Sequence, residues 1–210
     1  MLISFNEIVR KYGKPKGIIH IGAHLMEERS DYVSHGLSNT IWIEANPTIF
    51  KNIDFVNHQD SDEKSYNFAI SENGNEIVKL NITNNGQSSS ILDLDKHKIH
   101  HPHIYVSDIV EVLTKRMDDL IDEYKINISD YNFINLDIQG VELSALKSFG
   151  NLLESIDFIY TEVNTNYLYK DCCLINEIDE YLSNFGFKRV ETSITEYEWG
   201  DALYKKNLVK

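Results

Sequence analysis

The sequence predicts an α/β protein with a mostly parallel β-sheet covered by helices on both faces. Two observations predict this class. Short runs of β-branched and aromatic residues recur from Lys16 onward, and amphipathic stretches with helical spacing alternate with them. The 210 residues are 42% hydrophobic and 25% charged, which is typical of a globular chain. This length suffices to bury one sizeable core, so we expect a single domain over residues 1–210.

The expected strands follow one another along the chain, each a short apolar run bounded by turn or charged residues. They cover residues 17–21, 40–44, 65–70, 132–136, 156–162, 187–192 and 201–205.

The helices are expected between these strands. One lies between the first two strands and ends at Gly36, and Asn46 caps another that begins at Pro47. Later apolar residues follow the helical period over 141–149 and 174–185, and a glycine comes directly after each stretch.

The region 76–108 fits this alternation poorly. Two strand-like pieces, 77–82 and 89–92, flank a turn-rich stretch over 83–87, which predicts an inserted hairpin at about 76–92.

Four histidines crowd the segment after this hairpin: His97, His100, His101 and His103. A metal-binding tract would need convergent ligands together with a cysteine or carboxylate at a workable spacing, whereas a solvated loop needs neither. We therefore expect a solvated loop.

Charge and cysteine content bound the function. Lys and Arg total 20 against 33 Asp and Glu, a formal net charge of −13, and such a surface repels phosphate backbones, so a nucleic-acid partner is disfavoured. The two cysteines, Cys172 and Cys173, are adjacent and unsuited to a disulfide with each other, which favours a reducing, cytoplasmic setting. Neither a leader-like start nor an apolar run long enough to span a bilayer is recognisable, so no membrane association is expected. The oligomeric state cannot be inferred.

Three strand ends carry the candidate site. Gly22 follows the first strand in a turn that lets a ligand approach the backbone, and Glu44 ends the second strand, where a carboxylate can accept both hydroxyl hydrogens of a ribose. Asp137 follows the fourth parallel strand. Because ligands collect at the carboxyl ends of strands in open α/β sheets, these residues predict one crevice that holds a nucleoside.

The next strand ends in Glu162 and Asn164. With Asp137, their oxygens could hold a hard divalent cation. The alternative, which we favour, is that Glu162 and Asn164 line an acceptor site or a loop. The tyrosines and tryptophan at Tyr167, Tyr169, Tyr197 and Trp199 could line the same acceptor pocket or serve as packing at its rim.

In its ordered blocks the chain resembles the FkbM family of methyltransferases, over nearly its whole length. The blocks are HIGAH at 20–24, IEANP at 43–47, NFAIS at 67–71, NGQSSS at 85–90, RMDDL at 116–120, LDIQGVE at 136–142 and GF at 186–187.

The resemblance implies a Rossmann-like class I methyltransferase fold, with a seven-stranded sheet of order 3-2-1-4-5-7-6, an antiparallel last strand, and S-adenosyl-L-methionine (SAM) as cofactor. Under this resemblance Gly22 and Ala23 lie against the methionine part of SAM, Glu44 binds the ribose, and 67–70 borders the adenine. The full implied set of cofactor contacts is His20, Gly22, Ala23, His24, Glu44, Ala45, Asn46, Asn67, Ala69 and Asp137.

The expected reaction is O-methylation of a hydroxyl on a small molecule or glycan. Asp137 is the first candidate for the general base and His24 the second, because imidazole titrates near neutral pH. Gln139, Glu162 and Asn164 are the expected substrate contacts.

The first block departs from the family pattern, with His20 at a common Asp position, His24 at a common Asn position and Met26 at a common Gly position. These departures leave a second hypothesis open, a non-catalytic binding module that kept the fold and lost or weakened SAM binding. A nicotinamide-dependent oxidoreductase is disfavoured, because the turn lacks the second and third glycines of a pyrophosphate site.

Overall fold

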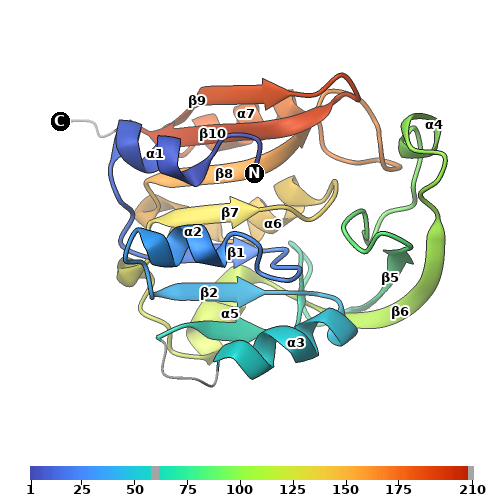
Figure 1. The fold of residues 1–210 in the computed structure, drawn as a ribbon. Helices are drawn as coiled ribbons and strands as arrows, with labels where there is room; N and C mark the ends of the chain where they lie inside the picture. Colours follow the sequence, from blue (N-terminus) through green and yellow to red (C-terminus); the bar gives the residue numbers. More distant parts are fainter. Residues whose placement is uncertain (58–61, 208–210) are drawn as a thin grey trace.

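The computed structural model describes residues 1–57 and 62–207. Its centre is a seven-stranded sheet in the order β3-β2-β1-β7-β8-β10-β9 (Figure 1). The strands are β1 (Ile18–Ile21), β2 (Thr40–Ile43), β3 (Lys64–Tyr66), β7 (Phe133–Leu136), β8 (Phe158–Asn164), β9 (Phe187–Ile194) and β10 (Trp199–Lys206). β10 runs antiparallel to both of its neighbours, and the other pairs are parallel. The expected fold class, strand order and antiparallel last strand are confirmed.

Helices cover both faces of this sheet (Figure 1). One apolar cluster contains residues of α1 (Phe5–Tyr12), α2 (Arg29–Ser34) and α3 (Pro47–Asn57) together with Ile18 and Trp42. The other contains residues of α5 (Met117–Glu123), α6 (Glu142–Ser148) and α7 (Ile175–Ser183) together with Ile19 and Ile41. Because successive strand residues point to opposite faces, every position of β1 and β2 is buried, which explains their continuous apolar runs.

The helix boundaries follow the local signals in the sequence. Gly36, with φ +69°, follows α2, and the Asn46 side chain accepts from the backbone N–H of Thr48 at 2.9 Å, which caps α3. α1 was not expected from the sequence. Ser4 caps it by accepting from Glu7 N at 3.3 Å. No helix within 1–57 and 62–207 combines the length and hydrophobicity that a membrane span requires.

The expected hairpin at 76–92 is wrong in its second strand. β5 (Ile77–Thr83) pairs antiparallel with β6 (Val106–Lys115), and residues 89–92 contribute only a single bridge, between Ser90 and Asn81. β6 is long and rich in β-branched residues. It prevails because pairing along its length buries Val112 against Leu80, which the four residues 89–92 are too few to match.

The expected strand 65–70 divides between two sheets. β3 extends the large sheet, whereas β4 (Ala69–Ile70) pairs parallel with β6 in a second sheet of order β4-β6-β5. The Asn67 side chain lies between them and donates to the carbonyls of Glu44 at 2.7 Å and Ala45 at 3.1 Å. These bonds hold the chain where it leaves the large sheet.

The solvated loop expected for the histidines is wrong for His97, whereas His103 is exposed in the loop after this segment. His97 lies in the short helix α4 (His97–His100) and is 6% exposed. Backbone bonds from Asp95 N and His97 N to Leu168 O hold this segment against the loop after β8 (Figure 1). Leu94 packs there in a cluster with Leu168 and Tyr169, which explains the burial.

Candidate functional site

The register of the large sheet brings the last residues of β1, β2 and β7 level with Thr161 of β8. Ile21 pairs with Ile43 on one side and with Leu136 on the other, and Leu136 pairs with Thr161. The next residue of each strand is therefore in line with the others at the carboxyl edge. These residues are Gly22, Glu44, Asp137 and Glu162, and all four line one cleft of about 560 Å³.

This cleft collects most of the side chains expected from the sequence. Its lining includes His20, Gly22, His24, Glu44, Ala45, Asn46, Ala69, Asp137, Gln139 and Glu162. It does not include Ala23, Asn67 or Asn164. The Ala23 side chain packs in the core beside α1 and α2, and Asn67 holds the turn after β2. Asn164 is fully buried, and neither atom of its amide group has a hydrogen-bond partner in the described part of the chain.

Gly22 is required by the neighbouring strand as well as by its own backbone. Its φ is +89°, and a Cβ at this position would lie 1.9 Å from the carbonyl oxygen of Asp137. The sequence suggested that the glycine makes room for a ligand. The structure shows that it makes room for the backbone of β7, and this close contact keeps the ends of β1 and β7 together.

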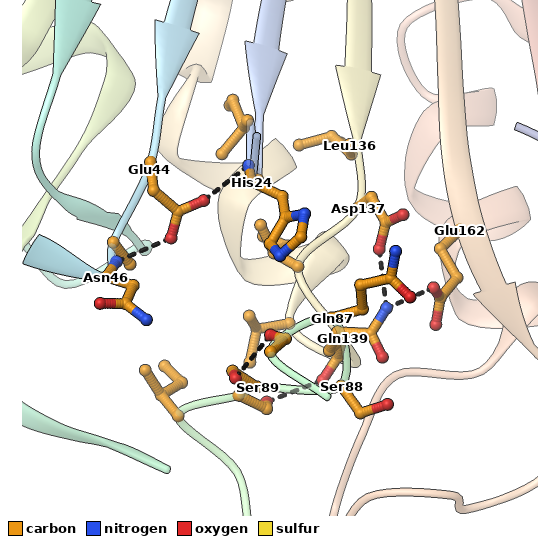
Figure 2. A pocket seen from close by; sticks show the side chains of 18 of the residues that line it. His24, Glu44, Asn46, Gln87, Ser88, Ser89, Leu136, Asp137, Gln139 and Glu162 are labelled. Carbon is orange, nitrogen blue, oxygen red and sulfur yellow. Dashed lines mark hydrogen bonds between the residues drawn. The ribbon is translucent and has the colours of Figure 1, made fainter. Parts of the chain in front are cut away.

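The Glu44 carboxylate is held by backbone donors. Its two oxygens accept from His24 N at 2.8 Å and from Asn46 N at 2.7 Å (Figure 2). Burial raises the pKa of Glu44, and the two N–H groups oppose that rise. A carboxylate has about four lone-pair sites, so Glu44 keeps acceptor capacity toward the cleft.

The two histidines of the first block differ in environment. His20 is buried under the cleft, where its Nδ1 lies 3.2 Å from the Tyr32 hydroxyl and its ring lies against Trp42, and burial lowers its pKa. His24 lies at the cleft surface, with Nδ1 2.6 Å from a Glu27 oxygen.

Met26 adopts a left-handed backbone conformation of the kind that favours glycine. Its φ is +60°, and its side chain packs into the core beside α1 and α2. Met26 is not among the lining residues of the cleft, so its side chain does not occupy the space beside Gly22.

A bridged pair of carboxyl groups lies across the cleft from Glu44. The Gln139 amide nitrogen donates to Asp137 at 2.7 Å and to Glu162 at 2.5 Å (Figure 2). Burial raises the pKa of both acids, that of Glu162 well above its ordinary value because Asp137 lies beside it. Gln139 itself has φ +58°, an uncommon backbone conformation for a residue with a side chain.

A loop from the inserted region covers the cleft. Ser90 Oγ donates to the Gln139 carbonyl at 2.8 Å, and Tyr169 Oη lies 2.5 Å from Gln139 Oε1 and 3.3 Å from the Ser88 carbonyl. A Cβ at Gly86 would lie 3.3 Å from His24 Nε2. Ser88 and Ser89 therefore lie between the Glu44 side and the Asp137 side of the cleft (Figure 2).

Sequence reasoning missed the histidines on one wall of the cleft, although it offered Tyr169 and Trp199 as possible lining of an acceptor pocket. His97, His101 and His103 line this wall with Tyr169 and Trp199. The histidine run was a visible signal, but its position depended on the unexpected docking of segment 93–97. Across the residues that can be described, no three or more His, Cys, Asp or Glu side chains are placed to hold a metal ion.

Solved structures with a similar fold include methyltransferases. M. capricolum TrmK, in complex with S-adenosylhomocysteine (SAH), has a TM-score of 0.53 at 10% identity over 99% of this chain and 70% of that one. A candidate tRNA (m1A22) methyltransferase of Streptococcus pneumoniae has a TM-score of 0.52 at 10% identity over 98% and 70%. A Streptococcus agalactiae protein of the NADB-Rossmann superfamily has a TM-score of 0.54 at 9% identity over 98% and 68%. At these identities the likeness shows the fold.

Curated protein sequences yield no match to this chain. The family comparison is more informative, because the model of the methyltransferase FkbM domain matches residues 20–189. This range contains Gly22, Glu44, Asp137 and Glu162 and all the candidate cofactor and catalytic residues. The chain therefore belongs to the FkbM family of methyltransferases, and its cofactor is SAM.

Proposed function

We propose that this protein transfers the methyl group of SAM to a hydroxyl of a small molecule or glycan. The observation that carries the proposal is the alignment of Gly22, Glu44 and Asp137 along one cleft. A volume of about 560 Å³ lies within the range of small-molecule sites. The cleft adjoins the ends of β1 and β2, which is the position at which nucleosides bind in open α/β sheets.

The residues present fit the cofactor in three respects. Glu44 has acceptor capacity for ribose hydroxyls, and Phe68, Ala69 and Ile138 give an apolar surface for an adenine ring. The carboxyl groups of Asp137 and Glu162 suit a cationic sulfonium. Ala23 and Asn67 would contribute through backbone and turn geometry, because their side chains do not line the cleft.

Bound SAM would supply an activated methyl group, so that the S–CH₃ bond breaks as the O–CH₃ bond forms and the hydroxyl loses its proton. The protein aligns the hydroxyl and accepts that proton. Asp137 is the proposed base because it lines the cleft and because burial raises its pKa, which makes its carboxylate a stronger base than a solvated one. His24, beside Glu27, is the second choice, and Gln139 and Glu162 are proposed contacts of the acceptor. We no longer propose that Asn164 contacts the substrate, and we propose that it supports the site from beneath.

The runner-up function is a binding module without catalysis. The departures at His20, His24 and Met26 motivated it, but the Met26 side chain packs in the core. We therefore favour the enzyme, acting as one domain in the cytoplasm, with nucleic acid disfavoured as an acceptor.

Isothermal titration calorimetry with SAM and SAH tests the proposal. We expect saturable binding of both and its loss in Glu44→Ala. Absence of binding at about 1 mM SAH would overturn the enzyme assignment and leave the binding module.

A further inference from the structure

The end of the cleft opposite Glu44 has a surface of its own. We define the histidine–aromatic wall as His97, His101, His103, Tyr169 and Trp199, all of which line the cleft. The wall comes from α4 and the residues that follow it, the loop after β8 and the start of β10 (Figure 1). If the cofactor lies over β1 and β2, this end is the space left for the acceptor.

Rings form a continuous surface along the wall. The His97 ring lies 5.6 Å from the Tyr169 ring and 5.0 Å from the His101 ring, measured between centroids. The His101 ring in turn lies 4.8 Å from that of Tyr197. Such side chains combine an apolar face with polar atoms at the rim. They suit a ligand that has both a flat C–H face and hydroxyl groups.

Two histidines of the wall, His97 and His101, are uncharged near neutral pH. Burial lowers the pKa of His97 to about 4 and also lowers the pKa of His101. A neutral imidazole is one donor and one acceptor rather than an anion site. His97 Nδ1 is moreover buried and has no hydrogen-bond partner within the described residues. A side chain that is 94% buried with an unsatisfied nitrogen would gain from a ligand that offers a hydroxyl.

The charged groups around the cleft disfavour an anionic acceptor. Six carboxyl groups line it: Glu27, Glu28, Glu44, Asp137, Glu162 and Asp201. Over the parts of the chain that the structure describes, no Lys or Arg lines it. A phosphate or carboxylate brought into this space would lose water and lie among these acidic groups. The ammonium group of Met1, which also lines the cleft, already lies 3.6 Å from a Glu28 oxygen.

We infer that the acceptor half of the cleft takes an electrically neutral, polyhydroxylated ring of the glycoside class, resting on the histidine–aromatic wall with one hydroxyl directed to Asp137. This inference rests on the proposed function and narrows its substrate class. It predicts that nucleotides, sugar phosphates and uronic acids are poor acceptors, although many glycans contain such groups.

Saturation-transfer NMR on the SAH-loaded protein tests the inference without knowledge of the natural acceptor. The probes are methyl glycosides of glucose, galactose, mannose, rhamnose and fucose, with the glucuronide, the galacturonide and glucose 6-phosphate as anionic counterparts. We expect saturation transfer to at least one neutral glycoside, and at least tenfold weaker binding of its anionic counterpart. The inference would be overturned if an anionic probe bound as tightly as its neutral counterpart, or if no neutral glycoside showed saturation transfer.

Variants locate the binding surface. His97→Ala and Trp199→Phe should each weaken neutral glycoside binding about tenfold while SAH affinity remains unchanged. His100→Ala is the matched control, because His100 belongs to the same tract but lies beside Glu198 at 3.3 Å and outside the cleft lining. Unchanged glycoside binding in both wall variants would contradict the assigned surface.

A charge reversal tests the electrostatic argument. His101→Lys should raise the affinity for the glucuronide relative to methyl glucoside, whereas His100→Lys should not. Lack of any shift in His101→Lys would contradict the argument from charge. The two levels of proposal fail differently: absence of SAH binding defeats the methyltransferase function, whereas SAH binding without glycoside binding defeats only the acceptor class.

Discussion

The carbonyl oxygen of Asp137 lies 1.9 Å from the point that a Cβ of residue 22 would occupy. This contact between the ends of β1 and β7 brings the turn that follows the first strand next to the proposed base. An atom added there must push apart two strands whose pairing in register sets the cleft.

Gly22→Ala should therefore damage both stability and the site. The substitution combines the clash with a φ of +89°, and we expect a loss of about 2–4 kcal/mol in the free energy of unfolding. Urea denaturation measures it. Gly186→Ala is the control, because its φ is +80° but no atom lies within 4 Å of the added Cβ. Equal losses in the two variants would show that the contact with Asp137 is unimportant.

Glu44→Gln should weaken SAH binding at least tenfold, which corresponds to about 1.4 kcal/mol. The amide can accept at only one atom, so one of the N–H groups of His24 and Asn46 would face another donor. Calorimetry measures the change. Glu191→Gln, at the ion pair with Lys11 outside the cleft, provides a charge-matched control. SAH affinity that is equal in both variants would remove Glu44 from the cofactor site.

Glu142 should make stability fall as the pH rises from about 4.5 to about 7. Burial raises the pKa of Glu142 from 4.5 to about 7, so the folded protein retains the proton more tightly than the unfolded chain does. Protonated Glu142 therefore stabilises the folded state fully below pH 4.5, and this stabilisation is lost gradually as the pH rises from 4.5 to 7. Relative to wild type, Glu142→Gln should gain up to about 3 kcal/mol over this window.

Urea denaturation of wild type and Glu142→Gln at several pH values checks this difference. His97 titrates with the opposite sign, because burial lowers its pKa, but its effect is common to both proteins and cancels. A difference that stays constant with pH would contradict the buried acid.

Tyr169→Phe should loosen the loop that covers the cleft. The lost hydroxyl leaves Gln139 Oε1 and the Ser88 carbonyl without this donor, at a cost of about 1–3 kcal/mol. Hydrogen exchange over residues 85–92 should accelerate. The same substitution at the exposed Tyr105 is the comparison, and unchanged exchange in Tyr169→Phe would show that the loop is held by other contacts.

Local patterns in the sequence sufficed for most of the large sheet. Apolar runs such as Ile18–Ile21 have one stable position, buried on both faces, and Gly and Asn mark the ends of helices. The alternation of strands and helices restricts the topology further, because parallel crossovers share one hand. This is why the sequence alone predicts Gly22, Glu44 and Asp137 at one edge of the sheet.

The inserted region depended on contacts between distant residues. Either of two segments, 89–92 or 106–115, is compatible with pairing to β5. The segment 106–115 pairs because this arrangement buries more apolar area, at Leu80 and Val112. Such a choice is not encoded in either segment alone. The histidine tract depends on the same tertiary decision, since segment 93–97 attaches to Leu168 of the loop after β8.

The sequence by itself determined the fold class and the three polar strand ends, because hydrophobic period and turn chemistry act over a few residues. Its resemblance to the FkbM family implied the order of the strands. Only the tertiary structure decided that Met26 turns into the core, that Gln139 bridges Asp137 and Glu162, and that His97 reaches the cleft. Those outcomes depend on packing between segments far apart in the chain, where burial and steric contact outweigh local preference.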